Sequence, residues 1–201
     1  TEKLVQEPVE EVIVFDNFTR GTMGNISEAR DSEKLTVIEG NVNHTDVLKD
    51  ALEGVDGVFH LAAMWLRHCY EYPRAAFDVN IQGTFNVMEA CVDQDVERVV
   101  YSSSASVYGD AVEIPMEEDH PYNNRTFYGA TKIAGEHMFR SFNERFGLNY
   151  AGLRYMNVYG PRQDYKGTYT AVMMKILDRL DEGKPPIVFG DGSQSYDFIY
   201  V

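Results

Sequence analysis

The stretch RVVYSSSASVYG (residues 98–109) carries the pattern that decides the fold. It opens with the apolar run Val99 to Tyr101, which is typical of a buried strand. A run of serines follows at once, where such a strand would end. Further along, residues 126–146 have the spacing of a long helix. A buried strand followed by a crossover helix predicts a βα unit of a parallel sheet.

The same alternation recurs along the chain. Apolar runs predict further strands at residues 10–17, 35–42, 55–63 and 148–160, and helical spacing predicts helices at 44–54, 73–92 and 167–183. The tail, residues 185–201, predicts a strand, a Gly-Asp-Gly turn and a further strand. The predicted class is therefore α/β, with a doubly wound, Rossmann-like parallel sheet that binds ligands at the carboxyl ends of its strands.

The composition limits the classes of function. The chain has 201 residues and a net charge of −14, which argues against a surface that binds nucleic acid. Cys69 and Cys91 lack CxxC spacing, and the five histidines lack the spacing of metal ligands, so no metal is expected. No apolar run reaches the roughly 18 residues of a membrane span, and no secretory signal opens the sequence. These features predict a cytoplasmic protein.

The stretch FYGATKIAGE (residues 127–136) places Tyr128 and Lys132 four residues apart, on one face of a helix. A phenol with a pKa of about 10 is a poor base near neutrality. A neighbouring ammonium group stabilises the phenolate, so the pair could act as an acid–base unit. Most such pairs are merely solvated helix residues, and the spacing alone leaves both interpretations open.

Two strand ends add to this pair. A serine hydroxyl in the run 102–104 could bond the substrate oxygen whose proton the tyrosine takes, although the serines could equally make turn bonds. Asp16 ends the strand 10–17, where an acid can accept bonds from the adenosine ribose and favours NAD. The alternatives are that Asp16 only caps a loop, or that Arg20 holds a 2′-phosphate.

Six motifs now stand in a recognisable order: FDNFTRG, HLAA, DVNIQGTFNVMEAC, VVYSSSASVYG, YGATK and LRYMNVYGPR. Together they resemble the extended short-chain dehydrogenase/reductases, and most closely the nucleotide-sugar 4-epimerases that act on UDP-glucose or UDP-hexuronates. The resemblance covers nearly the whole chain. It implies residues 1–160 as a dinucleotide-binding domain and 161–201 as the beginning of a substrate-binding region.

The resemblance also implies roles for individual residues. Tyr128 would be the acid–base residue, Lys132 would hold the nicotinamide ribose, and Ser104 would bond the sugar 4-oxygen. The cofactor NAD would contact a wider set: Asp16, Asn17, Asn41, Val42, Leu61, Ala62, Ala63, Asn80, Ser102, Tyr128, Lys132 and Tyr155. Asn157 would bond the diphosphate of the substrate.

In such epimerases NAD takes hydride from the sugar C4, the 4-keto sugar turns over, and hydride returns to the other face. Related 4,6-dehydratases carry an acid pair at the positions of Ala105 and Ser106, so a dehydratase is disfavoured; the decarboxylases that tend to carry a glutamate there are disfavoured too. Family members usually dimerise through two long helices, here 73–93 and 126–146.

The chain departs from the family pattern at several points. The expected G-x-x-G-x-x-G turn and carboxyl-terminal lobe do not occur in it, so we expect a fragment that turns over poorly by itself. Tyr196 replaces an arginine that binds the diphosphate, and Asn41 replaces an aspartate that contacts adenine.

These departures leave other functions open. One is an NAD(P)-dependent dehydrogenase or reductase acting on another hydroxyl substrate, and another is a non-catalytic relative that senses the cofactor.

Overall fold

The computed structural model describes residues 1–163 and 172–201. The chain forms two compact units, Thr1–Arg154 and Tyr155–Val201, and each is described by itself. The predicted functional division at residue 160 stays a prediction.

The first unit contains two parallel sheets. Strands β1 (Val12–Asp16) and β2 (Leu35–Glu39) pair with each other. Strands β3 (Gly57–His60), β4 (Arg98–Ser102) and β5 (Tyr150–Leu153) form the other sheet, with β4 in the centre. Each pairing is parallel, as predicted, so the carboxyl ends of β3, β4 and β5 lie at one edge.

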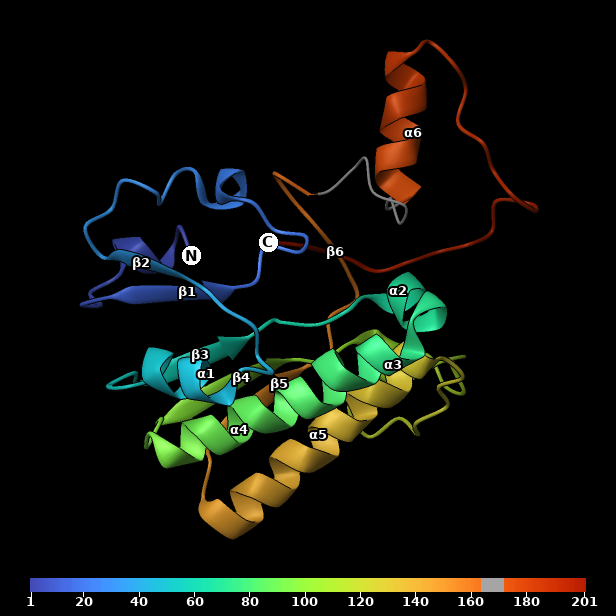
Figure 1. Ribbon diagram of the computed structural model, residues 1–201. Helices are drawn as coiled ribbons and strands as arrows, with labels where there is room; N and C mark the ends of the chain where they lie inside the picture. The colour runs from blue at the N-terminus through green and yellow to red at the C-terminus, as the bar shows by residue number, and fades with distance from the viewer. Residues whose placement is uncertain (164–171) are drawn as a thin grey trace. The chain divides into compact units, whose positions relative to one another are not determined.

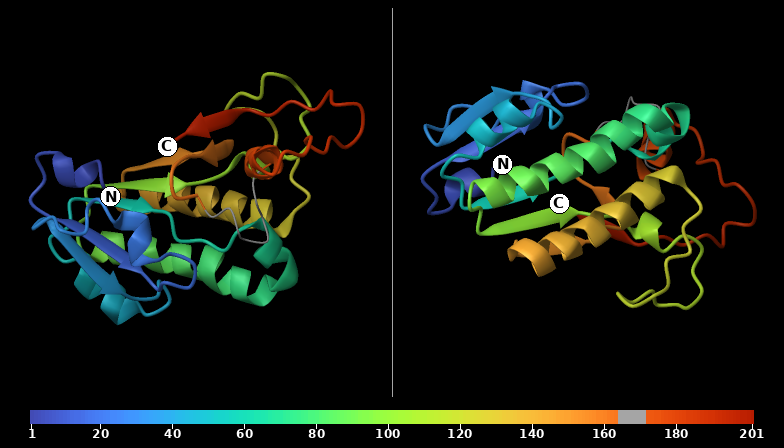
Figure 2. Two further views of the ribbon diagram at one scale, coloured as in Figure 1. Left: turned by 90° about the horizontal axis from the view of Figure 1, so that it is seen from above. Right: turned by 60° about the horizontal axis from the view of Figure 1, so that its bottom comes forward.

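Helices connect these strands. They are α1 (Thr45–Ala51), α2 (Leu66–Glu71), α3 (Pro73–Ala76), the π-helix η3 (Phe77–Gly83), α4 (Thr84–Asp93) and α5 (Phe127–Phe146). Short 3₁₀ turns lie at Leu4–Gln6 (η1), Met23–Ile26 (η2) and Ala105–Val107 (η4). The predicted helix 73–92 is thus continuous in α3, η3 and α4. Helices α4 and α5 pack together on one face of the β3–β4–β5 sheet (Figures 1 and 2).

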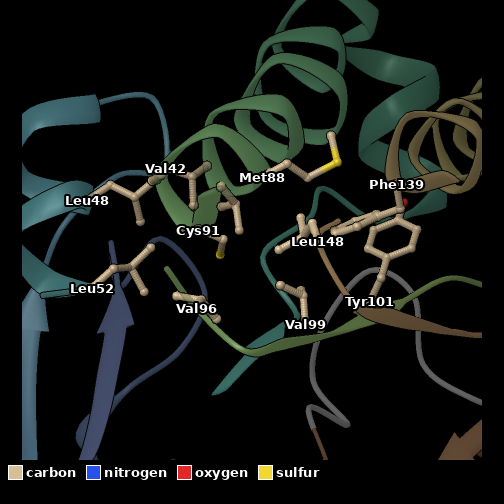
Figure 3. Close-up of a cluster of buried hydrophobic side chains, with 12 residues drawn as sticks. Val42, Leu48, Leu52, Met88, Cys91, Val96, Val99, Tyr101, Phe139 and Leu148 are labelled. Carbon is tan, nitrogen blue, oxygen red and sulfur yellow. The ribbon is translucent and has the colours of Figure 1, made fainter. Parts of the chain in front are cut away.

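The core lies between this sheet and these two helices and continues to α1, from which Leu48 and the C-cap residue Leu52 join it (Figure 3). Val99 and Tyr101 of β4 are buried, and the Tyr101 ring packs on Phe139 of α5 with ring centroids 4.9 Å apart. Gly135 makes this approach possible, because a Cβ there would lie 2.2 Å from the Tyr101 hydroxyl oxygen. The packing therefore fixes α5 directly against the strand that carries the serine run.

The predicted strand 148–160 is divided. Strand β5 ends at Leu153, opposite Ser102, because β4 itself ends there and offers no further partner. The rest of the segment forms β6 (Asn157–Tyr159) in the second unit, where it pairs with β7 (Phe198–Tyr200) in parallel.

Two further predictions fall in the second unit. The predicted strand at the start of the tail is wrong, since residues 185–189 are irregular and exposed. Pro185 and Pro186 remove two backbone donors there. Helix α6 (Val172–Asp181) lies within the predicted helix 167–183, of which residues 167–171 lie outside the described part. Across residues 1–163 and 172–201, no helix combines the length and apolar character needed to cross a lipid bilayer.

Candidate active site

The site is built at the carboxyl end of β4, where three successive serines face different partners. The Ser102 carbonyl accepts a bond from Lys132, and the Ser103 hydroxyl donates to the Glu136 carboxylate. Ser104 turns the chain, because its Oγ accepts the Ser106 amide at 3.1 Å and donates to the Ser106 hydroxyl at 3.0 Å. The turn interpretation and the substrate interpretation of the serines are therefore compatible, since a half-buried hydroxyl can exchange one partner for another.

Helix α5 brings the predicted acid–base pair to these serines. Thr126 caps the helix by accepting the Gly129 amide at 3.0 Å, which fixes the first turn and with it Tyr128. The Tyr128 side chain is half-buried, and its backbone carbonyl accepts the Thr131 hydroxyl at 2.7 Å.

Lys132 is buried with only 4% of its surface exposed. Its Nζ donates to the Ser102 carbonyl at 2.8 Å and lies 5.7 Å from the centroid of the Tyr128 ring. Burial lowers the pKa of Lys132 to about 8. The structure thus brings Tyr128, Lys132 and the serine run together. The ammonium group of Lys132 is buried and lies close to the half-buried phenol ring of Tyr128.

Asn80, from the π-helix η3, is 2% exposed and makes a set of long-range bonds. Its Oδ1 accepts the Met64 amide at 2.6 Å, and its Nδ2 donates to the Met64 carbonyl at 3.0 Å and to Thr131 at 3.1 Å. Asn80 therefore ties the turn after β3 to the first turns of α5. Direct contact of Asn80 with a cofactor stays a prediction.

The turn that Asn80 holds contains the predicted cofactor residues after β3. Leu61 and Ala62 are exposed and Ala63 is half-buried, so this backbone is accessible at the carboxyl end of the strand. His60, just before it, is buried and bonds Thr84 at 2.9 Å. Burial, and then the charge of Lys132, lower the pKa of His60 to about 3, so this histidine is neutral.

The predicted ribose side lies after β1 and β2. The Asp16 carboxylate is exposed and accepts the Phe18 amide at 2.7 Å, and Asn17 accepts the Thr19 amide at 3.1 Å. Asn41 likewise accepts the Asn43 amide at 2.9 Å. Val42 is a core residue with 8% of its surface exposed.

These residues fit a dinucleotide. An exposed carboxylate at the end of β1 can accept two ribose hydroxyls, and an accessible backbone turn at the end of β3 can run alongside the cofactor. Asp16 and Lys132 are the residues that would hold it. Among the described residues, no three His, Cys, Asp or Glu side chains are placed to hold a metal ion.

Two predicted residues, Tyr155 and Asn157, belong to the second unit, as does Tyr196, which departs from the family pattern. Tyr155 is half-buried, and Asn157 donates to the Asp197 carbonyl at 3.0 Å. Tyr196, at the position of the expected arginine, is 63% exposed. Their roles stay predictions.

Two polar residues of the first unit were not predicted from the sequence. Glu136 and Arg154 form a largely buried ion pair at 2.8 Å beside Ser103. One signal was available, because Tyr128, Lys132 and Glu136 follow each other at intervals of four and so share one face of α5.

Comparison with known proteins extends these observations. The chain matches the NAD dependent epimerase/dehydratase family over residues 1–201. It is 36% identical over 202 residues to a putative UDP-glucose 4-epimerase of Methanocaldococcus jannaschii, with 100% of this chain and 64% of that protein covered.

Solved structures of UDP-sugar 4-epimerases are also similar to this chain in sequence and fold. The UDP-N-acetylglucosamine 4-epimerase of Methanobrevibacter ruminantium M1, in complex with UDP-N-acetylmuramic acid, is 35% identical with a TM-score of 0.92, and 99% of this chain and 63% of that one are covered. The UDP-glucuronic acid 4-epimerase of Bacillus cereus, in complex with UDP-glucuronic acid and NAD, is 30% identical with a TM-score of 0.84, covering 99% and 65%. The predicted resemblance and the Rossmann-like fold are confirmed.

Proposed function

The chain belongs to the NAD dependent epimerase/dehydratase family, and we propose that the protein inverts C4 of a nucleotide sugar with NAD as its cofactor. The observation that carries this proposal is the buried Lys132 amine, 5.7 Å from the Tyr128 ring and bonded to the serine strand end. The chain spans 64% of the length of each of two curated relatives that it matches, so the activity is proposed for the protein as a whole.

The proposed chemistry assigns each side chain a task. Tyr128, in the first turn of α5 with its ring 5.7 Å from the Lys132 amine, takes the proton of the sugar 4-hydroxyl and later returns it. Lys132 stabilises the phenolate form of that tyrosine by its charge. Ser104 bonds the 4-oxygen and keeps it in reach. Bound NAD would supply the acceptor and then the donor of the hydride, with Asp16 on its ribose.

The substrate we propose is a UDP-hexose or a UDP-hexuronate. The support is that the relatives described above are named as UDP-sugar 4-epimerases. The turn η4 carries Ala105 and Ser106 where the dehydratases are expected to carry their acid pair. A proton shuttle without a second acid suits inversion at C4 better than elimination of water.

The test is an epimerisation assay with the intact protein, NAD and each of three sugars: UDP-glucose, UDP-N-acetylglucosamine and UDP-glucuronate. We expect the C4 epimer of one of them by NMR, without net NADH. Tyr128→Phe should reduce kcat by about 10²- to 10⁴-fold, the usual contribution of a general acid–base group. Full epimerase activity of Tyr128→Phe would contradict the acid–base role of Tyr128. If the biological function of the protein survives Tyr128→Phe, the protein is instead a non-catalytic cofactor sensor.

One observation favours a second candidate, an NAD-dependent dehydrogenase acting on a hydroxyl substrate that is not a sugar nucleotide. Tyr196 is exposed and offers no cation for a diphosphate. Net NADH production from a simple alcohol, with no epimer from any UDP-sugar, would decide for the dehydrogenase.

We also propose that two copies of the chain associate, in the cytoplasm, through the helix formed by α3, η3 and α4 and through α5. The support is that these helices leave three large aromatic side chains partly exposed: Phe77 (40%), Phe85 (41%) and Phe146 (53%). Light scattering should show a dimer that Phe85→Lys converts to a monomer, while Tyr70→Lys on α2 leaves it intact. A monomeric wild-type protein would contradict the proposal.

A further inference from the structure

The Glu136 carboxylate is the centre of a polar network that the proposed chemistry does not use. Arg154 binds it with two nitrogens, Nε to Oε1 at 3.0 Å and Nη2 to Oε2 at 2.8 Å. The hydroxyls of Ser103 and Tyr122 donate to the same carboxylate. The Glu136 and Arg154 side chains are only 13% and 17% exposed. Such a two-pronged pair has a defined direction as well as a charge.

The network also reaches two residues of the segment between the serine run and α5. Arg154, just after β5, also donates through Nη1 to the Tyr108 hydroxyl at 3.2 Å and to the Glu118 carbonyl at 2.7 Å. Burial alone would raise the pKa of Glu136, but bonds from Arg154, Ser103 and Tyr122 outweigh it and hold the pKa below its usual value. Glu136 therefore stays charged and bonded near neutral pH.

These bonds join two successive residues at the end of β4 to two residues of α5. Ser102 is the last residue of β4 and Ser103 follows it directly, while Lys132 and Glu136 lie one turn apart on α5. The Ser102 carbonyl bonds Lys132, and the Ser103 hydroxyl bonds Glu136. The strand end is thus fastened to the helix at two points about 6 Å apart along the helix axis.

We propose that Glu136, backed by Arg154, is a positioning residue that fixes the register of α5 against the serine strand end. The inference rests on the proposed function. Packing against the sheet and the bond from Lys132 already hold α5 close to the strand. The second bond adds a directional constraint at the strand end itself. It sets the Tyr128 hydroxyl, one turn before Lys132, relative to the Ser104 hydroxyl, one residue after Ser103.

Stability alone does not explain this network. A buried ion pair often contributes no more to the free energy of unfolding than a well-packed apolar pair would. Misplacement of a catalytic group by about 1 Å, in contrast, can reduce the rate about a hundredfold. The network joins α5 and the loop before it to Ser103, the residue directly before Ser104.

The test compares Ser103→Ala with Glu144→Gln in the intact protein. Ser103→Ala removes the bond between strand and helix but keeps the buried ion pair, so the fold should survive. Glu144→Gln breaks the exposed Arg140–Glu144 pair on the same helix and is the matched control. Two readouts are needed: steady-state kinetics, and hydrogen exchange of the peptide 127–136 without cofactor.

We expect Ser103→Ala to lower kcat by about ten- to a hundredfold with KM within twofold of wild type, and to speed exchange in residues 127–136. Glu136→Gln should give the same signature more strongly, and Glu144→Gln should change neither quantity. Wild-type kcat or unaltered exchange in Ser103→Ala overturns the proposal. If the wild-type protein epimerises no sugar nucleotide, the proposed function fails, and the exchange comparison alone decides on the positioning role.

Discussion

The two sides of the proposed cofactor site are held in different ways. On the α5 side, the bonds join residues far apart in the sequence, such as Lys132 to Ser102 and Asn80 to Thr131, and the groups are buried. On the β1 side, Asp16 and Asn17 are exposed and bond amides two residues away. One side is fixed by the tertiary structure and the other by its own loop.

This difference corresponds to two tasks, proton transfer on the α5 side and ribose binding on the β1 side. Proton transfer needs groups that are already in place, because movement during the reaction raises the barrier. Holding a ribose needs only an acceptor that the ligand can reach, and a local loop can supply it. We therefore expect changes on the α5 side to alter the free energy of unfolding strongly, and changes on the β1 side to alter binding.

The largest expected effect concerns His60 and acid. The folded protein keeps His60 neutral down to a pKa of about 3, whereas the unfolded chain binds a proton below about 6.5. The unfolded state therefore gains protons first, and stability falls as the pH drops from 6.5 toward 3. The loss is about 1.4 kcal/mol per pH unit, and in full about 4 to 5 kcal/mol.

Urea unfolding at pH 6.5, 5.5 and 4.5 measures this slope in wild type and in His60→Gln. The variant should lack the His60 share of the slope. His44→Gln, at an exposed histidine, should follow wild type. Equal dependence of stability on pH in wild type and His60→Gln would mean that burial in the folded protein does not keep His60 neutral.

A smaller effect of the same sign, at alkaline pH, concerns Lys132. Its pKa falls to about 8 in the folded protein, while the unfolded chain holds the proton up to about 10.5. Between these values the unfolded state binds more protons, so stability rises with pH, by about 3 kcal/mol in full. Lys132→Met should lack this rise and be at least as stable as wild type at pH 7, yet lose about a hundredfold or more in kcat.

Urea unfolding between pH 8 and 10 gives the difference, with Lys175→Met at an exposed lysine as control. A rise that persists in Lys132→Met would show that another group causes it.

The sequence predicted much of the α5 side. Each strand of the β3–β4–β5 sheet follows from an apolar run, and α5 follows from the helical spacing of residues 126–146. Tyr128, Lys132 and the serine run were expected together because a parallel sheet aligns strand ends at one edge. The family and its cofactor class, NAD, were also predicted correctly, since six ordered motifs are far more specific than any single one.

The remaining features depend on contacts that no local pattern contains. Arg154 lies in a run that reads as one strand, and the break after Leu153 arises because β4 ends opposite it. The Glu136 network joins residues as far apart in the sequence as 103 and 154, so its members come together only in the folded chain. The apolar residues after Pro185 and Pro186 led to the wrong prediction of a strand there, although two successive prolines disfavour a strand.

The smallest expected effect on stability comes from Asp16→Ala on the β1 side. The carboxylate is exposed, and its bond to the Phe18 amide closes a local turn, so the free energy of unfolding should change by less than about 1 kcal/mol. A charged acceptor on two ribose hydroxyls contributes about 1.5 to 3 kcal/mol, so NAD should bind the variant about ten- to a hundredfold more weakly by calorimetry. Asp50→Ala, an exposed acid on α1, controls for charge. A loss of more than about 2 kcal/mol in unfolding would show that the β1 side is built as rigidly as the α5 side, and unchanged NAD affinity would take Asp16 out of the cofactor site.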